Sequence, residues 1–216
     1  MKVTDKITIT NECNMELMAR YPDNYFELAI VDPPYGINFA KKGDGSKTLT
    51  KHKWKNHTKK DWDNKIPEEE YFKELFRVSK NQIIWGANYM TKYLPSSMGW
   101  IFWDKGQRDF SLADGELAFS SFQKALRVFT YTRGAQMGEN TERFHPTQKP
   151  VALYKWLLDK YAKQGDKILD THLGSGSIAI ACHDYGFELT CCELDKEYYD
   201  KAIQRITNHA SQQKLF

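Results

Sequence analysis

The sequence predicts a single α/β domain in which a doubly wound, mostly parallel sheet carries helices on both faces. Three observations lead to this prediction. Strand-like apolar segments alternate with amphipathic helical segments along the chain. A length of 216 residues is enough for one such domain with a full core. The composition, 41% hydrophobic and 27% charged with a formal net charge of only +3, is typical of a soluble globular protein.

The N-terminal part of the chain predicts two strands and two helices. Residues 7–10 alternate polar and apolar side chains as a strand does, and Asn14 is placed to begin a short helix. Residues 26–31 are apolar enough for a central strand, which Pro33 and Pro34 then end. A helix is expected from residue 66 to about 79, because Pro67 stands early and acidic residues fill the first turn.

The rest of the chain continues the alternation. Short apolar segments predict strands at residues 82–85, 100–103, 116–120, 126–131, 167–170 and 187–192. Helices are predicted from near Pro150 to Gly165, over residues 177–185 and over residues 196–210. Residues 40–66 interrupt the pattern with nine lysines against three aspartates, and we interpret them as a basic mobile loop.

Cysteine usage and the absence of targeting signals predict a cytoplasmic protein. No signal peptide or membrane span is recognisable in the sequence. The four cysteines form no C-x-x-C pair, and we expect them to be reduced, mostly buried thiols: Cys13, Cys182, Cys191 and Cys192.

A glycine-containing loop between a predicted strand and helix indicates an adenosine site. The segment from Asp170 through Thr171, His172, Gly174, Ser175 and Gly176 leads into the helix, and Glu193 and Leu194 follow the next strand. Glycines let the backbone approach a ligand closely, and a carboxylate at the neighbouring strand end accepts hydrogen bonds from ribose hydroxyls. Residues 174–179 also satisfy the G-x-G-x-x-G/A dinucleotide pattern, so this segment alone fits a nicotinamide enzyme equally well.

Asp32-Pro33-Pro34-Tyr35 favours a methyltransferase over a nicotinamide enzyme. Methylating an amino group requires a nitrogen lone pair directed at a methyl sulfonium, and in adenine that lone pair is delocalised into the ring. Asp32 and the backbone carbonyl of Pro33 are able to accept both amino hydrogens, and Tyr35 is able to stack on a base that has left the duplex. No metal is required, because the leaving group is a neutral thioether and positioning does most of the work.

In these motifs the chain resembles the β group of DNA amino-methyltransferases, which act on N6 of adenine or N4 of cytosine. Asp32 to Tyr35 match the catalytic motif, residues 145–150 match the H-P-T-x-K-P segment, and residues 170–177 resemble the D-P-F-x-G-S-G cofactor loop. The order, catalytic motif first and cofactor motifs last, matches the circular permutation that defines the group. The resemblance covers essentially the whole chain.

The resemblance implies a Rossmann-like methyltransferase sheet of seven strands with one antiparallel strand, and S-adenosylmethionine as cofactor. Asn11 and Glu12 are expected beside the cofactor's adenine, and Asp32 is expected to touch the cofactor as well as the base. Thr147, Gln148 and Lys149 are expected at a helix start that favours the cofactor's carboxylate. Thr171 and His172 depart from the family, which usually has proline and phenylalanine there.

Double-stranded DNA is the partner that the resemblance implies. The basic loop is expected to bind phosphates and the displaced strand through Lys51, Lys53, Trp54, Lys55, Lys59 and Lys60. Residues 122–144 form an unusually short segment for target recognition, and the candidates for contacts with base edges are Arg108, Arg127, Arg133 and Arg143.

The preference for adenine over cytosine rests on the resemblance alone. An amino-methyltransferase of RNA or of protein glutamine is a further alternative, although Asp32 argues against the glutamine enzymes, which usually show Asn-Pro-Pro-Tyr. A catalytically silent DNA-binding protein of the same fold is another. Whether the chain forms a homodimer or works with a cognate restriction endonuclease stays open.

Overall fold

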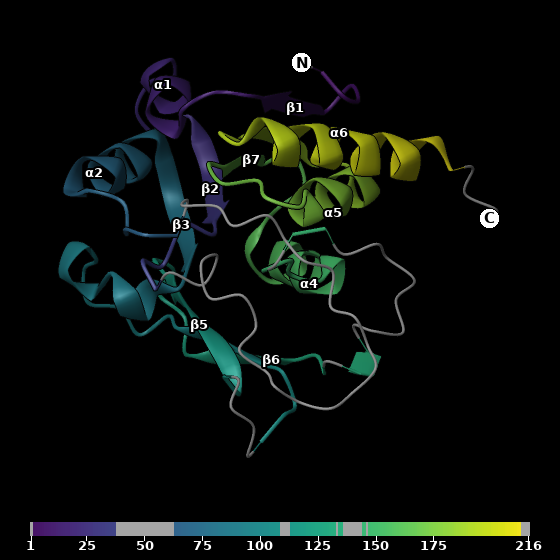
Figure 1. Cartoon of the computed structure of the whole chain (residues 1–216). Helices are drawn as coiled ribbons and strands as arrows, with labels where there is room; N and C mark the ends of the chain where they lie inside the picture. The colour runs from purple at the N-terminus through teal and green to yellow at the C-terminus, as the bar shows by residue number, and fades with distance from the viewer. Residues whose placement is uncertain are drawn as a thin grey trace.

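The computed structural model describes residues 2–37, 63–108, 113–132, 134–135, 144–145 and 147–212. Within them, eight strands form one sheet in the order β1-β8-β7-β2-β3-β5-β4-β6 (Figure 1). Their bounds are β1 Ile7–Thr10, β2 Phe26–Val31, β3 Ser79–Trp85, β4 Ile101–Asp104, β5 Gly115–Ser120, β6 Arg127–Thr130, β7 Lys167–Asp170 and β8 Glu188–Cys192. The sequence pattern predicts a strand at or near each of these eight positions, whereas the seven strands that the resemblance implies are one too few.

The helices fall close to the positions that the sequence predicts. Their bounds are α1 Asn14–Ala19, α2 Glu69–Val78, α4 Val151–Tyr161, α5 Ser177–Tyr185 and α6 Lys196–Ser211, with short 3-10 turns η1 Ala87–Tyr89 and η2 Thr91–Tyr93. Strands β2 and β7 and helix α5 have the predicted bounds. Helix α2 begins at Glu69 rather than at residue 66, and β3 follows it at once because Ser79 is already extended.

The strand directions confirm a mostly parallel sheet with one reversed strand. Strands β1, β8, β7, β2 and β3 pair in parallel, with Ile30 opposite Ile83 and Ile168 opposite Leu189. Strand β5 runs antiparallel to both β3 and β4, whereas β4 and β6 are parallel. Because the reversal comes after β3, the five parallel strands form an uninterrupted half of the sheet.

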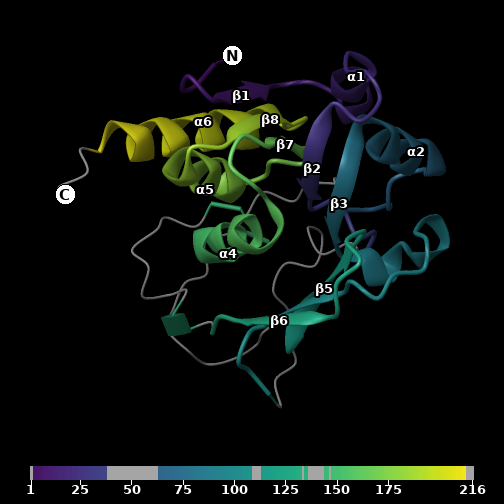
Figure 2. The ribbon, with the colours of Figure 1, turned by 180° about the vertical axis from the view of Figure 1, so that it is seen from behind.

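Two helical layers bury the two faces of this parallel half. In β2, Leu28 and Ile30 face the core under α4, α5 and α6, whereas Ala29 and Val31 face the core under α1 and α2. The views from front and back show the two groups of helices on opposite sides of the strands (Figures 1 and 2). Residues of both faces are almost fully buried, which explains why β2 is apolar at every position except Glu27.

The parallel directions bring four strand ends to one edge of the sheet. Asp32 follows β2, the loop that begins at Thr171 follows β7, Glu193 follows β8 and Asn11 follows β1. Open α/β sheets bind ligands at this carboxyl edge, because loops from neighbouring strands converge there. In the order β1-β8-β7-β2, the end of the first strand lies beside that of the Glu193 strand.

Three of the four cysteines are buried as expected, whereas Cys13 is only partly buried. Cys182, Cys191 and Cys192 are buried and free, and burial raises the pKa of the Cys191 thiol well above its usual range. Among the residues that the structure describes, no helix has the length and apolar character that crossing a membrane requires.

Shortening one side chain of the central strand β2 should measure how much the stability of the fold depends on that strand. Leu28→Ala removes a side chain that is 1% exposed, so we expect the free energy of unfolding to fall by about 2–5 kcal/mol. Val128→Ala on the edge strand β6, where the side chain is 52% exposed, is the control and should change it by less than about 0.5 kcal/mol. Urea unfolding measures both, and equal effects would contradict the described core.

Candidate active site

Asp63 shapes the turn that carries the Asp-Pro-Pro-Tyr motif. Its Oδ1 accepts hydrogen bonds from the backbone N–H groups of Tyr35 and Gly36, each at 2.9 Å. Asp63 is only 3% exposed and comes from the chain just before α2. In the sequence it is one of three acids in a lysine-rich stretch, and nothing in that pattern distinguishes it from a solvated aspartate.

A buried lysine contacts the catalytic motif. Lys149 Nζ lies 2.5 Å from Asp32 Oδ2 and 3.2 Å from the Tyr35 hydroxyl. The Tyr35 hydroxyl donates to Asp32 Oδ1 at 2.7 Å, so each carboxylate oxygen of Asp32 has one partner. The side chain of Lys149 is 2% exposed and that of Asp32 17% exposed. The ion pair therefore joins segments that lie 117 positions apart in the sequence.

Glu116 and Lys105 extend this contact into a cluster of four charges. Glu116 Oε2 lies 3.1 Å from Lys149 Nζ, and Glu116 Oε1 lies 2.6 Å from Lys105 Nζ. Glu116 is on β5, the reversed strand, and Lys105 follows β4. Neither residue is predicted as a site residue from the sequence, because a charged side chain in or next to a short strand usually faces solvent.

The pKa shifts follow from burial and from these neighbours. Burial raises the pKa of the Asp32 carboxyl, Glu116 adds to this, and Lys149 opposes it. Burial also acts to raise the pKa of Glu116, but Lys149 and Lys105 outweigh it and bring the pKa to about 2. Burial lowers the pKa of Lys149, yet the two carboxylates prevail and raise it. Two ammonium groups thus balance two carboxylates.

The Tyr35 ring is held in place by close packing. It stacks on Tyr89 with ring centroids 5.4 Å apart and an interplanar angle of 17°. Gly86 has a left-handed backbone with φ of 65°, and a Cβ there would lie 2.0 Å from Tyr35 Cε1. Glycine at the end of β3 therefore makes room for the ring of the motif, while Tyr89, 47% exposed, presents an aromatic surface beside it.

The glycine loop after β7 is tied to the end of β8. Glu193 Oε2 accepts from the Gly174 N–H at 2.8 Å, and Oε1 accepts from the Asp195 N–H at 2.9 Å. Gly176 has φ of 76° and stands at the start of α5, where Arg205 of α6 donates to the carbonyl of Ser175 at 2.8 Å. The predicted cofactor residues Gly174, Ser175, Gly176 and Glu193 thus form one structure at the carboxyl edge.

Thr171 and His172, the departures from the family pattern, form a chain of hydrogen bonds. Asn14 Nδ2 lies 3.0 Å from His172 Nε2, so Nε2 accepts and Nδ1 carries the proton. His172 Nδ1 lies 2.9 Å from Thr171 Oγ1, which is 2.7 Å from the hydroxyl of Tyr71. The chain joins the cofactor loop to α1 and α2, which gives His172 a structural role.

Burial controls the ionisation of two further groups in this loop. Burial brings the pKa of the His172 imidazole down to about 3, so the ring is neutral at physiological pH. Burial raises the pKa of the Asp170 carboxyl to about 8, although its Oδ1 accepts the backbone N–H of His172 at 2.9 Å. The Asp170 and His172 side chains are therefore shielded from water within this loop.

The other predicted cofactor residues lie at or near the same edge. Asn11 Nδ2 donates to the carbonyls of Glu193 and Leu194 at 2.7 and 3.1 Å. Glu12 forms an ion pair with Arg20 at 2.6 Å. Leu194 is 73% exposed, so its side chain is free to cover an apolar or aromatic ligand.

The segment before α4 lies differently from the prediction. Helix α4 begins at Val151, so Thr147, Gln148 and Lys149 precede its first turn rather than forming it. Thr147 Oγ1 is 3.2 Å from His145 Nδ1, and the Lys149 carbonyl accepts from Ser177 Oγ at 2.7 Å. Pro150 has an extended backbone, so the helix begins only at Val151. Lys149, which precedes Pro150, contacts Asp32.

Most of the predicted DNA contacts lie outside the described residues: Lys51, Lys53, Trp54, Lys55, Lys59, Lys60, Arg133 and Arg143. Arg108 is described, and its two terminal nitrogens donate to Asp104 at 2.9 and 3.1 Å. The first part of the predicted recognition segment, residues 122–144, contains β6, which pairs with β4 as an edge of the sheet. Arg127 begins this strand and is exposed.

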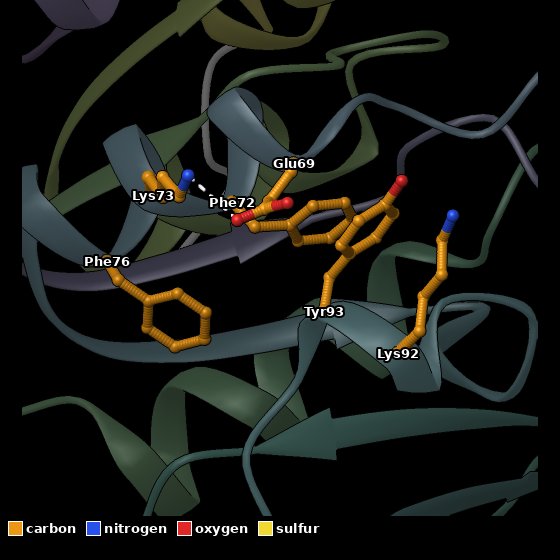
Figure 3. Close-up of a pocket in the computed structure, with 6 residues that line it drawn as sticks. All are labelled: Glu69, Phe72, Lys73, Phe76, Lys92 and Tyr93. Atoms are coloured by element: carbon orange, nitrogen blue, oxygen red, sulfur yellow. Dashed lines mark ion pairs between the residues drawn. The ribbon is translucent and has the colours of Figure 1, made fainter.

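A hollow of about 580 Å³ lies apart from these motifs, between α2 and η2 (Figure 3). It is lined by Glu69, Phe72, Lys73, Phe76, Lys92 and Tyr93, none of which is a predicted site residue. In the described part of the chain, no group of three or more histidine, cysteine, aspartate or glutamate residues is arranged to hold a metal ion.

The fold is a Rossmann-like methyltransferase sheet, and its site combines a glycine loop, an acidic strand end and Asp-Pro-Pro-Tyr on neighbouring strands.

Comparison with known proteins indicates the same class of protein. The N6/N4 methyltransferase family model, described as "DNA methylase", matches residues 122–204. The Type II methyltransferase M.HpaI of Haemophilus parainfluenzae is 26% identical over 85% of this chain and 69% of its own length. The Type II methyltransferase M2.DpnII of Streptococcus pneumoniae is 27% identical over 64% of this chain, which spans about half (53%) of that relative.

Solved structures share the fold. The crystal structure of an M1.HpyAVI–SAM complex matches with a TM-score of 0.59 at 20% identity, covering 92% of this chain and 99% of that one. The PvuII DNA methyltransferase (cytosine-N4-specific) matches with a TM-score of 0.58 at 11% identity, covering 96% and 92%. Together the sequence and structure comparisons confirm the predicted resemblance of the chain to the β-group DNA amino-methyltransferases.

His172 should make the fold sensitive to acid. The imidazole takes up a proton below pH 6.5 in the unfolded chain but only near pH 3 in the folded one, so the free energy of unfolding should fall as the pH drops through this window. His172→Phe should flatten this part of the pH dependence of thermal unfolding. The same substitution at partly exposed His183 is the matched control and should keep the wild-type slope. An unchanged slope in His172→Phe would contradict the neutral state of the ring in the folded protein.

Proposed function

We propose that the chain is a site-specific DNA N6-adenine methyltransferase that takes its methyl group from S-adenosylmethionine. The observation that carries the proposal is the meeting of Asp32, the glycine loop and Glu193 at the ends of the neighbouring parallel strands β2, β7 and β8. An amino-group acceptor and an adenosine-type site are thereby adjacent in space, although 138 positions separate Asp32 from Asp170 in the sequence. The family comparison supports the same activity in its general form.

The chemistry of the residues present fits S-adenosylmethionine. Glu193 uses one lone pair on each oxygen for the backbone, which leaves acceptor capacity for ribose hydroxyls. Exposed Leu194 is suited to cover the adenine, and Asn11 holds the Leu194 backbone in place. When bound, the cofactor supplies a methyl sulfonium, and transfer breaks its carbon–sulfur bond, forms a carbon–nitrogen bond and releases one amino proton. We propose the contacts of Thr147, Gln148, Lys149, Asp170, Thr171 and His172 by resemblance.

Asp32 is the group that we expect to activate the amino nitrogen. Its carboxylate keeps one lone pair on each oxygen after bonding to Tyr35 and Lys149, so it is able to accept an amino hydrogen. Pro33 and Pro34 hold the turn stiff, and its backbone N–H groups are anchored on Asp63. Aligning the lone pair of the base with the methyl group lowers the barrier mainly through positioning.

The base must leave the duplex to reach this edge. Tyr35 and Tyr89 offer aromatic faces on which a base extruded from double-stranded DNA is able to stack. We propose that the basic residues of the 40–66 loop bind the phosphate backbone and that residues 122–144, with Arg108 and Arg127, read the target within a single methyltransferase domain. Buried thiols are in keeping with a cytoplasmic enzyme.

DNA N4-cytosine methylation is the second candidate. It is favoured by the structural likeness to the PvuII enzyme, whose name states that specificity. Both reactions use an exocyclic amino group, so Asp32 and Tyr35 serve either base, and the choice of adenine rests on the resemblance of the motif. A homodimer or a partner endonuclease is compatible with this proposal and is not needed for the chemistry.

Replacing Asp32 should separate catalysis from cofactor binding. Asp32→Ala should lower methyl transfer from radiolabelled cofactor by about a hundredfold or more, because the acceptor of the amino hydrogen is lost. Cofactor affinity, measured by isothermal titration calorimetry, should stay within about twofold. Exposed Asp5→Ala is the control and should be fully active. Loss of cofactor binding in a folded Asp32→Ala protein would remove Asp32 from the catalytic role.

The modified nucleoside identifies the base. DNA from a methylation-free host that expresses the protein should yield N6-methyldeoxyadenosine on digestion and mass spectrometry, and sequencing of the same DNA should locate the target site. N4-methyldeoxycytidine instead would establish the second candidate. Neither product, with the cofactor bound and the DNA in excess, would identify a catalytically silent DNA-binding protein.

A further inference from the structure

Lys149 Nζ lies close to acceptor oxygens of three different residues. The distances are 2.5 Å to Asp32 Oδ2, 3.1 Å to Glu116 Oε2 and 3.2 Å to the Tyr35 hydroxyl oxygen. An ammonium has three donors, so this set leaves none for a second bond to Asp32. Lys149 therefore contacts one oxygen of Asp32 and leaves Oδ1 to Tyr35.

The arrangement matters because Asp32 must accept a further hydrogen bond from the amino group of its substrate. A buried ammonium whose only charged partner is one carboxylate draws close to both of its oxygens and competes with the substrate. Glu116 offers a second negative charge, and Lys105 at 2.6 Å keeps Glu116 ionised and oriented. The attraction on Lys149 is thus divided between Asp32 and Glu116.

We propose that Glu116 is a positioning residue for amino methylation: it shares the ammonium of Lys149 with Asp32 and so keeps the Asp32 carboxylate available to the substrate. The inference rests on the proposed role of Asp32 as the acceptor. It goes beyond the motifs, because neither Glu116 nor Lys105 belongs to any of them. Lys149 in turn opposes the effect of burial, which raises the pKa of the Asp32 carboxyl.

Several ionisable groups, including the other members of the cluster, surround Asp32 and have to be considered in any pH dependence. They are Tyr35 in the motif, Glu116 on β5, Lys105 after β4, Lys149 before α4, Tyr154 on α4, Asp170 at the end of β7 and Tyr71 on α2. Burial raises the pKa of each of the three tyrosines, so they stay neutral. Asp170, with a pKa near 8, is the one neighbour among them that is expected to change charge near neutral pH.

The test compares the ionisation of Asp32 in variants of almost unchanged shape. Glu116→Gln removes a negative charge, so the pKa of the Asp32 carboxyl should fall by about one unit. Lys149→Met removes the cation, so that pKa should rise by at least as much. NMR of protein labelled with ¹³C at aspartate carboxyls, with Asp32→Asn to assign the signal, measures both shifts without requiring any activity. Glu116→Gln/Lys149→Met should lie between the two single variants.

The kinetic readout is the loss of turnover without a loss of binding. Glu116→Gln should lower kcat by roughly ten- to hundredfold, as the loss of a group that orients a reacting side chain does, with KM for DNA and cofactor within about twofold. Glu116→Asp should recover part of the loss. Exposed Glu197→Gln, which removes an acid paired with Lys201 on α6, is the matched control and should change neither kcat nor the Asp32 pKa.

The outcomes distinguish the inference from the proposed function. An unchanged Asp32 pKa in a folded Glu116→Gln protein, or an equal loss of stability and activity that Glu116→Asp does not recover, would overturn the positioning role. Opposite pKa shifts in the two single variants, with a wild-type protein that methylates no DNA, would support the charge coupling and refute the proposed function. Opposite pKa shifts together with a selective loss of kcat support both.

Discussion

The parallel pairing of β2 with β7, and of β7 with β8, is the constraint on which the rest of the site depends. Each strand is buried on both faces, so its direction and register are imposed by two separate cores. The ends of the three strands therefore meet at one edge, with Asp32, the glycine loop and Glu193 side by side. Residues that lie far apart in the sequence form a single site because the order and direction of the strands bring their ends together.

Within that site, burial is the dominant physical influence. A lysine that is 2% exposed is stable only with charged partners, and the structure provides Asp32 and Glu116, with Lys105 completing a balanced set of charges. This cluster couples the motif to the reversed strand β5 and to the segment before α4. Removing any one member leaves an uncompensated buried charge, so the four groups act as a unit and their individual contributions are not additive.

The cofactor loop illustrates how a departure from a family pattern is accommodated. Proline and phenylalanine would make this loop stiff and apolar, whereas Thr171 and His172 replace them with hydrogen bonds to Asn14 and Tyr71. The imidazole is partly buried and neutral, so it acts as a polar connector rather than as an acid or base. The loop is thereby held to α1 and α2, whereas Arg205 and Glu193 hold it to α6 and β8.

The sequence by itself determined the element order, the strands β2 and β7, the helix α5 and the motifs, since apolar periodicity, prolines and glycines act over a few residues. It also placed Asp32, Gly174 and Glu193 at one edge, because parallel α/β sheets follow general rules of connection. Only the tertiary structure decided that Lys149 contacts Asp32 and that Glu116 and Asp63 support the motif. These contacts join residues 28 to 117 positions apart, and a single charged residue in a sequence shows no sign of the partner that burial will give it.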